Sequence, residues 1–280
     1  MVRKLLCGVL ALLIPALAAG GASAQGGWTY DSYLKAMQDS GRRSDLTKAS
    51  FDQMQQRRGN ALRNLETYLK GKFGEADPYV MKAFAEVPRE YFHFNYAGPW
   101  SFARDAYDWY PRPWAIGYGS ALSDFLGQAY MTQLAKPRPG ENALEIGTGS
   151  GYQISILSRV VSKAYSIEII EPLGTAVSKI FKPAGLDNVE SRVGDGYYGW
   201  PEVKEGFDII MVTCVAQHVP PELLRQLKPG TGRLIIPVGQ PFRREQVLYV
   251  FTKDADGRIN SRRDVGVYFI PMTGRISKGR

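Results

Sequence analysis

A run of alternating glycines stands between an apolar segment and a segment of helical pattern. Glycine at such positions allows a tight turn and lets the backbone approach a ligand closely at the carboxyl end of a strand. The spacing is G-x-G-x-G, whereas the dinucleotide-binding turn is G-x-G-x-x-G, so we expect a ligand without a pyrophosphate group. The residues expected at this ligand are Glu145, Gly147, Thr148, Gly149 and Ser150.

Acidic residues further along the chain narrow the kind of ligand. Glu168 ends the next apolar run, 21 residues after Gly147, where a carboxylate can accept both hydroxyls of a ribose. Asp195 and Gly196 follow the third run, where a carboxylate can meet the amine of an adenine. Glu145 is placed to hold an ammonium group, directly or through water. Together they predict an adenosine carrying an amino acid; the alternative is a structural glycine turn with surface acids.

These residues need a sheet whose strand ends meet at one edge. After Pro139, apolar runs of strand length alternate with segments of helix length, which favours a parallel sheet with helices on both faces. The expected strands are Ala143–Ile146, Ala164–Ile167, Val189–Val193, Asp208–Val212 and Leu234–Val238. The expected helices are Tyr152–Val161, Leu173–Phe181 and Pro221–Leu227. Gln246–Thr252 and Val265–Ile270, on either side of Asp256-Gly257, are expected to pair as an antiparallel hairpin.

The chain before residue 76 has a different character. Apolar residues at helical spacing predict an amphipathic helix near Ser50–Lys70, so residues 25–75 form a helical appendage that packs on the main domain, 76–280, or binds a partner. A short helix is expected from Asp77 to the residue before Pro88. The aromatic segment 91–114 is expected to be a long loop, either a functional lid or a cover over the core. The predicted fold class is α/β: a Rossmann-like, doubly wound, mostly parallel sheet with an antiparallel C-terminal hairpin and this appendage.

The first 24 residues are typical of a secretory signal peptide. Arg3 and Lys4 precede an apolar run, Leu5–Ala19, which is shorter than the roughly 20 residues of a membrane-spanning helix. Small residues at positions 22–24 complete the pattern. We therefore expect export to the periplasm and no stable membrane insertion after cleavage. An uncleaved anchor and a wrongly chosen start codon are the alternatives.

Composition excludes several other classes of function. The formal net charge is +8, but the basic residues form no aromatic-interleaved stripe, so no nucleic acid is expected. Cleavage would remove Cys7 and leave Cys214 alone, which excludes an intrachain disulfide and a cysteine-based zinc site. The two histidines, His93 and His218, are too few for a multi-histidine metal site, so no metal is expected.

The ordered motifs resemble a known family, the class I S-adenosylmethionine-dependent methyltransferases and, more narrowly, protein-L-isoaspartate (D-aspartate) O-methyltransferase. The motifs shared with the wider class are Glu145–Tyr152, Tyr165–Glu168, Gly194–Gly196, Phe207-Asp208 and Gln226–Gly230. Those shared with the narrower family are Val87–Phe92, Ala106–Asp108, Ile116–Gly119, Gly199–Glu202, Ile236–Gly239 and Val267–Met272. The resemblance covers about Asp77 to Gly274.

The resemblance implies S-adenosyl-L-methionine as cofactor. Its methionine part would lie near Glu145, Gly147 and Ser150, its ribose at Glu168, and its adenine beside Asp195-Gly196. The family's T-I-S-x-P stretch, whose serine is taken as the active-site residue, corresponds here to 121–125. Ser123 is therefore the expected catalytic residue.

The chain departs from the family pattern around this serine. Ala121 and Phe125 replace the threonine and the proline, and Asp124 would repel an anionic acceptor if its side chain faced the site. His218, in a second divergent stretch, is expected either to bind an acceptor carboxylate or act as a base, or to have a surface or capping role. Cys214 is expected to be a small buried residue.

The resemblance implies methyl transfer to the carboxylate of L-isoaspartyl or D-aspartyl residues in damaged proteins. The expected partner is a protein or peptide with such residues, and the enzyme is expected to be a monomer. Two alternatives stay open: a methyltransferase with a different acceptor, and an exported binding module that keeps the fold without catalysis. Because the family's default location is the cytoplasm, where S-adenosylmethionine is made, the export signal conflicts with the cofactor.

Overall fold

The computed structural model describes residues 28–108, 110 and 112–277. The expected signal peptide lies outside these residues. The helices are α1 (Tyr30–Asp39), α2 (Lys48–Phe73), α3 (Pro78–Glu86), α4 (Phe125–Ala135), α5 (Tyr152–Ser158), α6 (Glu171–Val177) and α7 (Pro221–Arg225). The strands are β1 (Phe94–Asn95), β2 (Trp100–Ser101), β3 (Trp114–Gly117), β4 (Ser120–Leu122), β5 (Asn142–Ile146), β6 (Lys163–Glu168), β7 (Val189–Val193), β8 (Ile209–Val212), β9 (Arg233–Val238), β10 (Gln246–Lys253) and β11 (Ile259–Val267). Short 3₁₀ turns are η1 (Arg89–Phe92), η2 (Ala103–Asp105), η3 (Lys182–Ala184), η4 (Gly196–Tyr198) and η5 (Arg275–Ser277).

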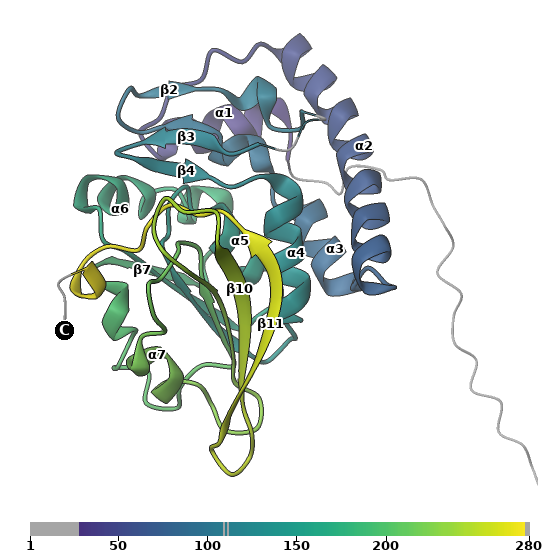
Figure 1. The fold of residues 1–280 in the computed structure, drawn as a ribbon. Coiled ribbons are helices and arrows are strands. Elements are labelled where there is room, and N and C mark those ends of the chain that lie inside the picture. The colour runs from purple at the N-terminus through teal and green to yellow at the C-terminus, as the bar shows by residue number, and fades with distance from the viewer. Residues whose placement is uncertain (1–27, 109, 111, 278–280) are drawn as a thin grey trace, which may run out of the picture.

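A sheet in the order β11-β10-β9-β8-β5-β6-β7 forms the centre of the molecule (Figure 1). The strands from β9 to β7 are parallel, and β10 is antiparallel to both of its neighbours. The chain enters the sheet at β5, runs outward to β7, and then returns to β8 to run outward on the other side. The connections after β5 and β8 therefore diverge, which is where doubly wound sheets bind ligands. The predicted fold class is confirmed.

Each face of the sheet packs into a separate apolar cluster. Alternate strand residues such as Ala143 and Met211 pack with the helices α1 to α6, while Leu144 and Val212 pack with residues of η4, α7 and η5. β5 and β8 are buried along their whole length, as expected for central parallel strands. Their continuous apolar character explains why the predicted strands match the observed ones. The predicted helices after β5, β6 and β8 are also present, and each ends two to four residues earlier than expected.

The second strand of the C-terminal hairpin was placed wrongly from the sequence. The prediction was Val265–Ile270, but β11 runs from Ile259 to Val267. β11 is the edge of the sheet, pairs only with β10 and is exposed along most of its length. Charged residues such as Arg262 and Arg263 protect such an edge from pairing with other chains, and they remove the apolar signal on which the prediction depended.

The N-terminal helices are joined to the sheet domain by a continuous core. α2 contains the predicted helix near Ser50–Lys70, begins with a Thr47 cap and ends at Gly74, whose φ of 79° is in the left-handed region. α2 packs against α4, and α3 packs against α5 (Figure 1). The appendage therefore packs on the main domain, as predicted.

Several aromatic side chains of the segment 91–114 are buried in the core, whereas Trp100 and Tyr110 are exposed. The segment contains η1, η2 and the two-residue strands β1 and β2, so the expectation of one long loop was wrong. Tyr91 and Phe92 are fully buried. The His93 ring is also buried, with the Phe102 ring centroid 4.9 Å away, and burial holds the pKa of His93 well below its usual value. The segment thus acts as a cover over the core, which was one of the two alternatives.

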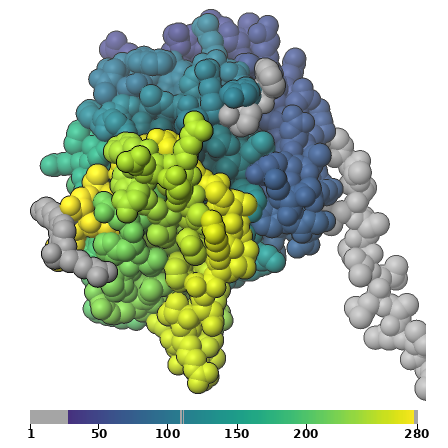
Figure 2. Space-filling view, viewed as in Figure 1, coloured from purple at the N-terminus to yellow at the C-terminus, as the bar shows by residue number. Residues whose placement is uncertain are grey.

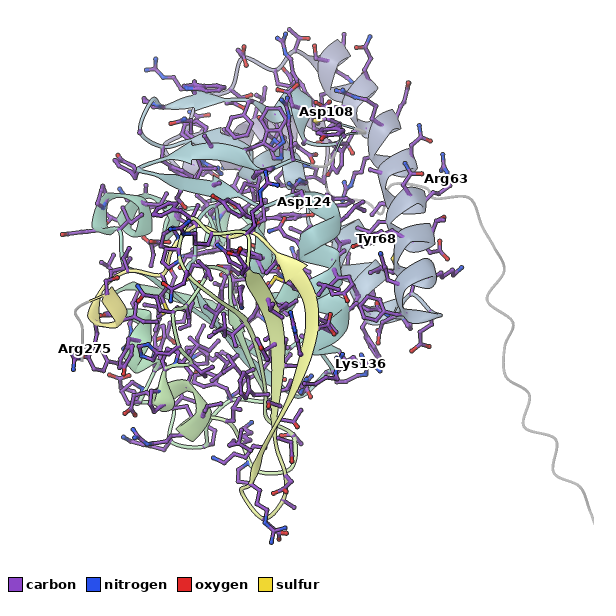
Figure 3. The ribbon with its side chains drawn as sticks, viewed as in Figure 1. Arg63, Tyr68, Asp108, Asp124, Lys136 and Arg275 are labelled. Atoms are coloured by element: carbon purple, nitrogen blue, oxygen red, sulfur yellow. The ribbon has the colours of Figure 1, made fainter. Side chains whose placement is uncertain are left out.

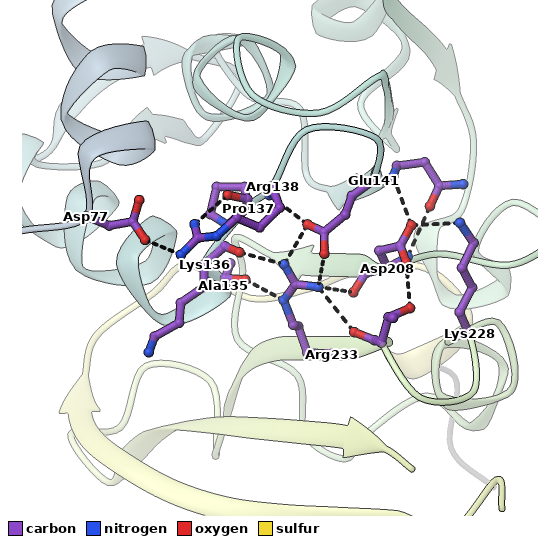
Figure 4. Close-up of polar contacts among 11 residues, drawn as sticks. Asp77, Ala135, Lys136, Pro137, Arg138, Glu141, Asp208, Lys228 and Arg233 are labelled. Carbon is purple, nitrogen blue, oxygen red and sulfur yellow. Dashed lines mark hydrogen bonds and ion pairs between the residues drawn. The ribbon is translucent and has the colours of Figure 1, made fainter. Parts of the chain in front are cut away.

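A network of polar contacts around Arg233 ties the start of the sheet to α4 (Figure 4). The Arg233 guanidinium donates to both carboxylate oxygens of Glu141, at 2.8 and 2.7 Å. It also donates to backbone carbonyls at the end of α4, including that of Lys136 at 2.8 Å. Both side chains of the Arg233–Glu141 pair are mostly buried, at 15% and 17% exposure. The network holds the loop that leads into β5 in place.

Removal of this arginine should destabilise the fold. We expect Arg233→Met to lower the free energy of unfolding by about 2–4 kcal/mol, because Glu141 and several carbonyls lose their partner in a mostly buried position. Denaturant unfolding measures the change. The matched control is Arg258→Met in the exposed β10–β11 turn, expected to change stability by less than about 0.5 kcal/mol. Equal effects of the two variants would contradict the role of the network.

Candidate functional site

A cavity with a volume of about 810 Å³ lies at the carboxyl edge of β5 and β6. Its walls also include residues of α2, β4, α4, β10 and β11. It collects nearly all of the site residues expected from the sequence: Ser123, Glu145, Gly147, Thr148, Gly149, Ser150, Glu168 and Gly196. These residues come from four separate parts of the chain, and the sheet topology brings them together.

The glycine turn is fixed by its neighbours on both sides. Gly147, Gly149 and Gly151 have φ values of 95°, 53° and 82°, all in the left-handed region that side chains disfavour. A Cβ on Gly147 would lie 2.8 Å from the Oγ1 atom of Thr213, whose hydroxyl donates to the Gly147 carbonyl at 2.7 Å. A Cβ on Gly149 would meet protein atoms only at 3.8 Å or beyond, so the open space there belongs to the cavity.

Glu145 places a buried carboxyl group in the cavity wall. It is 1% exposed, and the Ser166 hydroxyl donates to its Oε2 atom at 2.8 Å. The Thr148 hydroxyl lies 2.7 Å from that of Ser166, so the turn is connected to both strands. Burial raises the pKa of Glu145 well above its usual value, and the nearby Glu168 adds to this effect. A cationic group in the cavity would favour the charged form of Glu145 and be bound by it.

Glu168 is held by the backbone at the end of β6. Its Oε2 atom accepts from the Gly149 amide at 2.8 Å, and its Oε1 atom accepts from the Ile170 amide at 3.0 Å. Burial raises the pKa of Glu168, while these backbone bonds oppose the shift. Two carboxylate oxygens offer about four acceptor positions, so the backbone bonds leave acceptor capacity for hydroxyl groups of a ligand.

Asp195 lies beside the cavity, and its neighbour Gly196 lines it. The Asp195 carboxylate accepts from the amides of Tyr197 at 2.9 Å and Arg275 at 2.7 Å, which connects η4 to η5. At Gly196, a Cβ would lie 2.3 Å from a methyl carbon of Ile146, so only glycine fits. The structure thus brings the backbone at Gly196 to the cavity, and the contact between Asp195 and an adenine stays a prediction.

Ser123 lies between β4 and α4, on a loop that Arg89 holds in place through a hydrogen bond. The buried Arg89 guanidinium donates to the Ser123 carbonyl at 2.7 Å and to Gln128 Oε1 at 2.6 Å. Sequence reasoning missed this role, although the Val87–Phe92 motif contains the arginine. Arg89 is therefore a positioning residue for the loop that carries Ser123.

Asp124 caps α4 and also lines the cavity. Its Oδ1 atom accepts from the Gly127 amide at 2.7 Å, and the positive end of the helix dipole offsets part of its charge. Figure 3 shows Asp124 where the chain enters α4, and Tyr68 on the neighbouring α2. The sequence did not determine which way Asp124 points. In the structure its carboxylate binds the amino end of its own helix, and this contact reduces its repulsion of an anionic acceptor.

The two divergent residues after β8 differ in their placement. Cys214 is buried and lines the cavity, and burial raises the pKa of its thiol. His218 is partly exposed, does not line the cavity, and has its ring 6.2 Å from that of Tyr197. The geometry therefore favours the surface alternative for His218.

Several cavity residues were not expected from the sequence. Tyr68 and Lys72 come from α2, and Phe242 and Tyr268 come from the segments before β10 and after β11. Tyr268 belongs to the motif Val267–Met272, but no local pattern connects any of the four with the site, because only the tertiary fold brings them there.

Within residues 28–108, 110 and 112–277, no group of three or more His, Cys, Asp or Glu side chains is arranged to hold a metal ion. A search of the same residues finds no helix both long and apolar enough to cross a bilayer.

A doubly wound sheet with a glycine turn and two acids at its carboxyl edge defines a Rossmann-like enzyme of the methyltransferase class. Comparison with known proteins identifies the family. The model of the family "Protein-L-isoaspartate(D-aspartate) O-methyltransferase (PCMT)" matches residues 62–277, so the chain belongs to this family. The family and the enzyme class predicted from the sequence are confirmed.

Individual relatives agree with this assignment. Protein-L-isoaspartate O-methyltransferase 2 of Syntrophobacter fumaroxidans is 48% identical over 71% of this chain and 76% of its own length. A solved protein-L-isoaspartate O-methyltransferase is 28% identical, with a TM-score of 0.66 over 78% of this chain and 67% of that chain. A Plasmodium falciparum structure assigned to the same family, in complex with S-adenosyl-L-homocysteine, has a TM-score of 0.61 at 24% identity over 76% of this chain and 97% of that chain, and supports the fold.

Proposed function

We propose that this protein transfers the methyl group of S-adenosyl-L-methionine to the carboxylate of L-isoaspartyl and D-aspartyl residues in damaged proteins. The observation that carries the proposal is the convergence of Glu145, Glu168 and the glycine turn with Ser123 on one cavity. Membership of the family and the name of the Syntrophobacter relative support the same activity.

The residues present fit the cofactor. The buried Glu145 carboxyl matches an amino-acid ammonium group, and the free acceptor positions of Glu168 match two ribose hydroxyls. The backbone at Gly149 and Gly196 leaves room where side chains would intrude on the cavity or on Ile146. When bound, S-adenosyl-L-methionine supplies an electrophilic methyl group on a positively charged sulfur.

The contribution of the chain is to position the acceptor and exclude water. A carboxylate acceptor is ionised at neutral pH, so no strong base is needed. The Ser123 hydroxyl can donate to that carboxylate and orient it, and Arg89 fixes the loop on which Ser123 stands. The Cys214 thiol stays protonated because burial raises its pKa, so it does not compete with the carboxylate as a nucleophile.

Two variants separate cofactor binding from transfer. Glu168→Gln should weaken S-adenosylhomocysteine binding at least about tenfold, because one charge-assisted acceptor is lost. Ser123→Ala should retain cofactor affinity and lower the rate of transfer to an isoaspartyl peptide by about 10- to 100-fold, because the acceptor is less well oriented. Calorimetry and a methyl-transfer assay read the two effects. The control is Glu202→Gln, an exposed carboxylate paired with Arg192 and outside the cavity.

The alternatives give different results in the same assays. Cofactor binding without transfer to an isoaspartyl peptide would favour a different acceptor, which the replacements Ala121 and Phe125 keep open. Absence of cofactor binding would contradict both enzyme functions and favour an exported binding module. If both site variants behaved like wild type, the assignment of Glu168 and Ser123 would be wrong.

We also propose that the protein is an exported monomer, with residues 1–24 as a cleaved signal peptide, and that after cleavage it binds no nucleic acid and has no stable membrane insertion. The basic, apolar and small-residue pattern of the first 24 residues supports export. Mass spectrometry of the protein from the periplasmic fraction should find an N-terminus at Gln25. An intact Met1 in the cytoplasm would contradict export.

A further inference from the structure

A second hollow lies beside the C-terminal hairpin and shares lining residues with the cavity. Its volume is about 660 Å³, and its walls are Phe242, Arg244, Gly266, Val267 and Tyr268. We call it the flanking groove. Four of its five residues also line the main cavity, and the fifth is Arg244, so the two spaces share a wall.

The flanking groove carries exposed aromatic side chains. Phe242 is 74% exposed and Tyr268 is 63% exposed, the two highest values among the large hydrophobic residues of the described chain. Phe242 also has a φ of 60°, a left-handed conformation that is strained for a bulky residue. Strain of this kind gathers at functional positions, where the surrounding structure maintains it. In Figure 2, the lime-green loop that leads into β10 stands out from the surface of the molecule.

The charge of the flanking groove is positive. Arg243 and Arg244 are exposed, and in the part of the chain that the structure describes neither forms an ion pair within 4.0 Å. Glu245 is the neighbouring acid in the loop and is also exposed. Of these charged residues only Arg244 lines the groove, and its guanidinium beside aromatic side chains matches a peptide segment that carries a carboxylate.

The floor of the flanking groove is open at Gly266. A Cβ there would meet only the Gln246 carbonyl oxygen, at 3.9 Å, and the φ of Gly266 is outside the left-handed region. A larger side chain is therefore compatible with the strand and would occupy the groove. Because Gly266 also lines the main cavity, a substitution there tests the groove only if the affinity for S-adenosylhomocysteine stays as in wild type.

We propose that the flanking groove binds the substrate chain next to the isoaspartyl residue and favours an acidic residue there, with Phe242 and Tyr268 holding the peptide and Arg244 pairing with its carboxylate. The inference rests on the proposed function, because the groove is defined by its continuity with the cavity that takes the acceptor. It identifies the preferred substrates as isoaspartyl sites in acidic stretches of protein.

The test compares isoaspartyl peptides of one sequence in which a single residue is Glu, Ala or Lys, placed two positions before or two positions after the isoaspartyl residue. At one of these positions, kcat/KM of the full-length protein should be about 3- to 10-fold higher for Glu than for Lys. The preference should fall in 0.5 M salt, because exposed charges are screened.

Variants of groove residues test whether the preference for Glu over Lys peptides arises in the flanking groove. Arg244→Glu should reverse the ratio of Glu to Lys peptides, and Gly266→Val should lower kcat/KM for all of them through a higher KM. Arg258→Glu, in the exposed hairpin turn, is the matched control and should leave the ratio as in wild type. If the Ala peptide is methylated but Glu and Lys peptides react equally well, the inference is wrong and the proposed function stands. The same holds if Arg244→Glu leaves the ratio of Glu to Lys peptides unchanged. No methylation of any isoaspartyl peptide would overturn the proposed function and the inference with it.

Discussion

The chain leaves the buried strand β5 and enters the buried helix α5 within five residues, and the site depends on this reversal. Its backbone amides are used by the neighbouring strand: those of Gly147 and Thr148 donate to the Ile167 carbonyl at 2.9 and 3.3 Å, and that of Gly149 donates to Glu168. Thr213 fixes the turn from the side of β8. The position of the Glu168 side chain therefore depends on the shape of the turn, and a ligand must fit the two together.

The part of the cavity around Ser123 is organised separately from the glycine turn. The loop of Ser123 is not part of the sheet, and its position depends on the buried Arg89 and on the capping of α4 by Asp124. α2 packs against α4 and supplies Tyr68 and Lys72 to the same wall. The N-terminal helices thus support the loop that carries Ser123, whereas the sheet supports Glu168 and the glycine turn.

Sequence reasoning succeeded where the signal is local. Buried parallel strands such as β5 and β8 are apolar runs, and the glycine turn and Glu168 stand at fixed offsets from them. It failed at β11, whose exposed edge residues are polar. It also missed the contact of Arg89 with Ser123 and the place of Phe242 in the cavity wall, because both depend on residues distant in sequence. The position of Asp195 directly after β7 predicted a contact with the ligand. In the structure its carboxylate accepts a hydrogen bond from the amide of Arg275, a contact that no local pattern reveals.

The central claim is that the cavity beside the glycine turn holds the adenosyl cofactor and orients the acceptor. A crystal structure of the protein with S-adenosylhomocysteine and an isoaspartyl peptide tests it most directly. We expect the ribose hydroxyls within hydrogen-bond distance of Glu168 and the peptide carboxylate within hydrogen-bond distance of the Ser123 hydroxyl. A cofactor bound away from Glu168, or an acceptor carboxylate held by other residues, would contradict it.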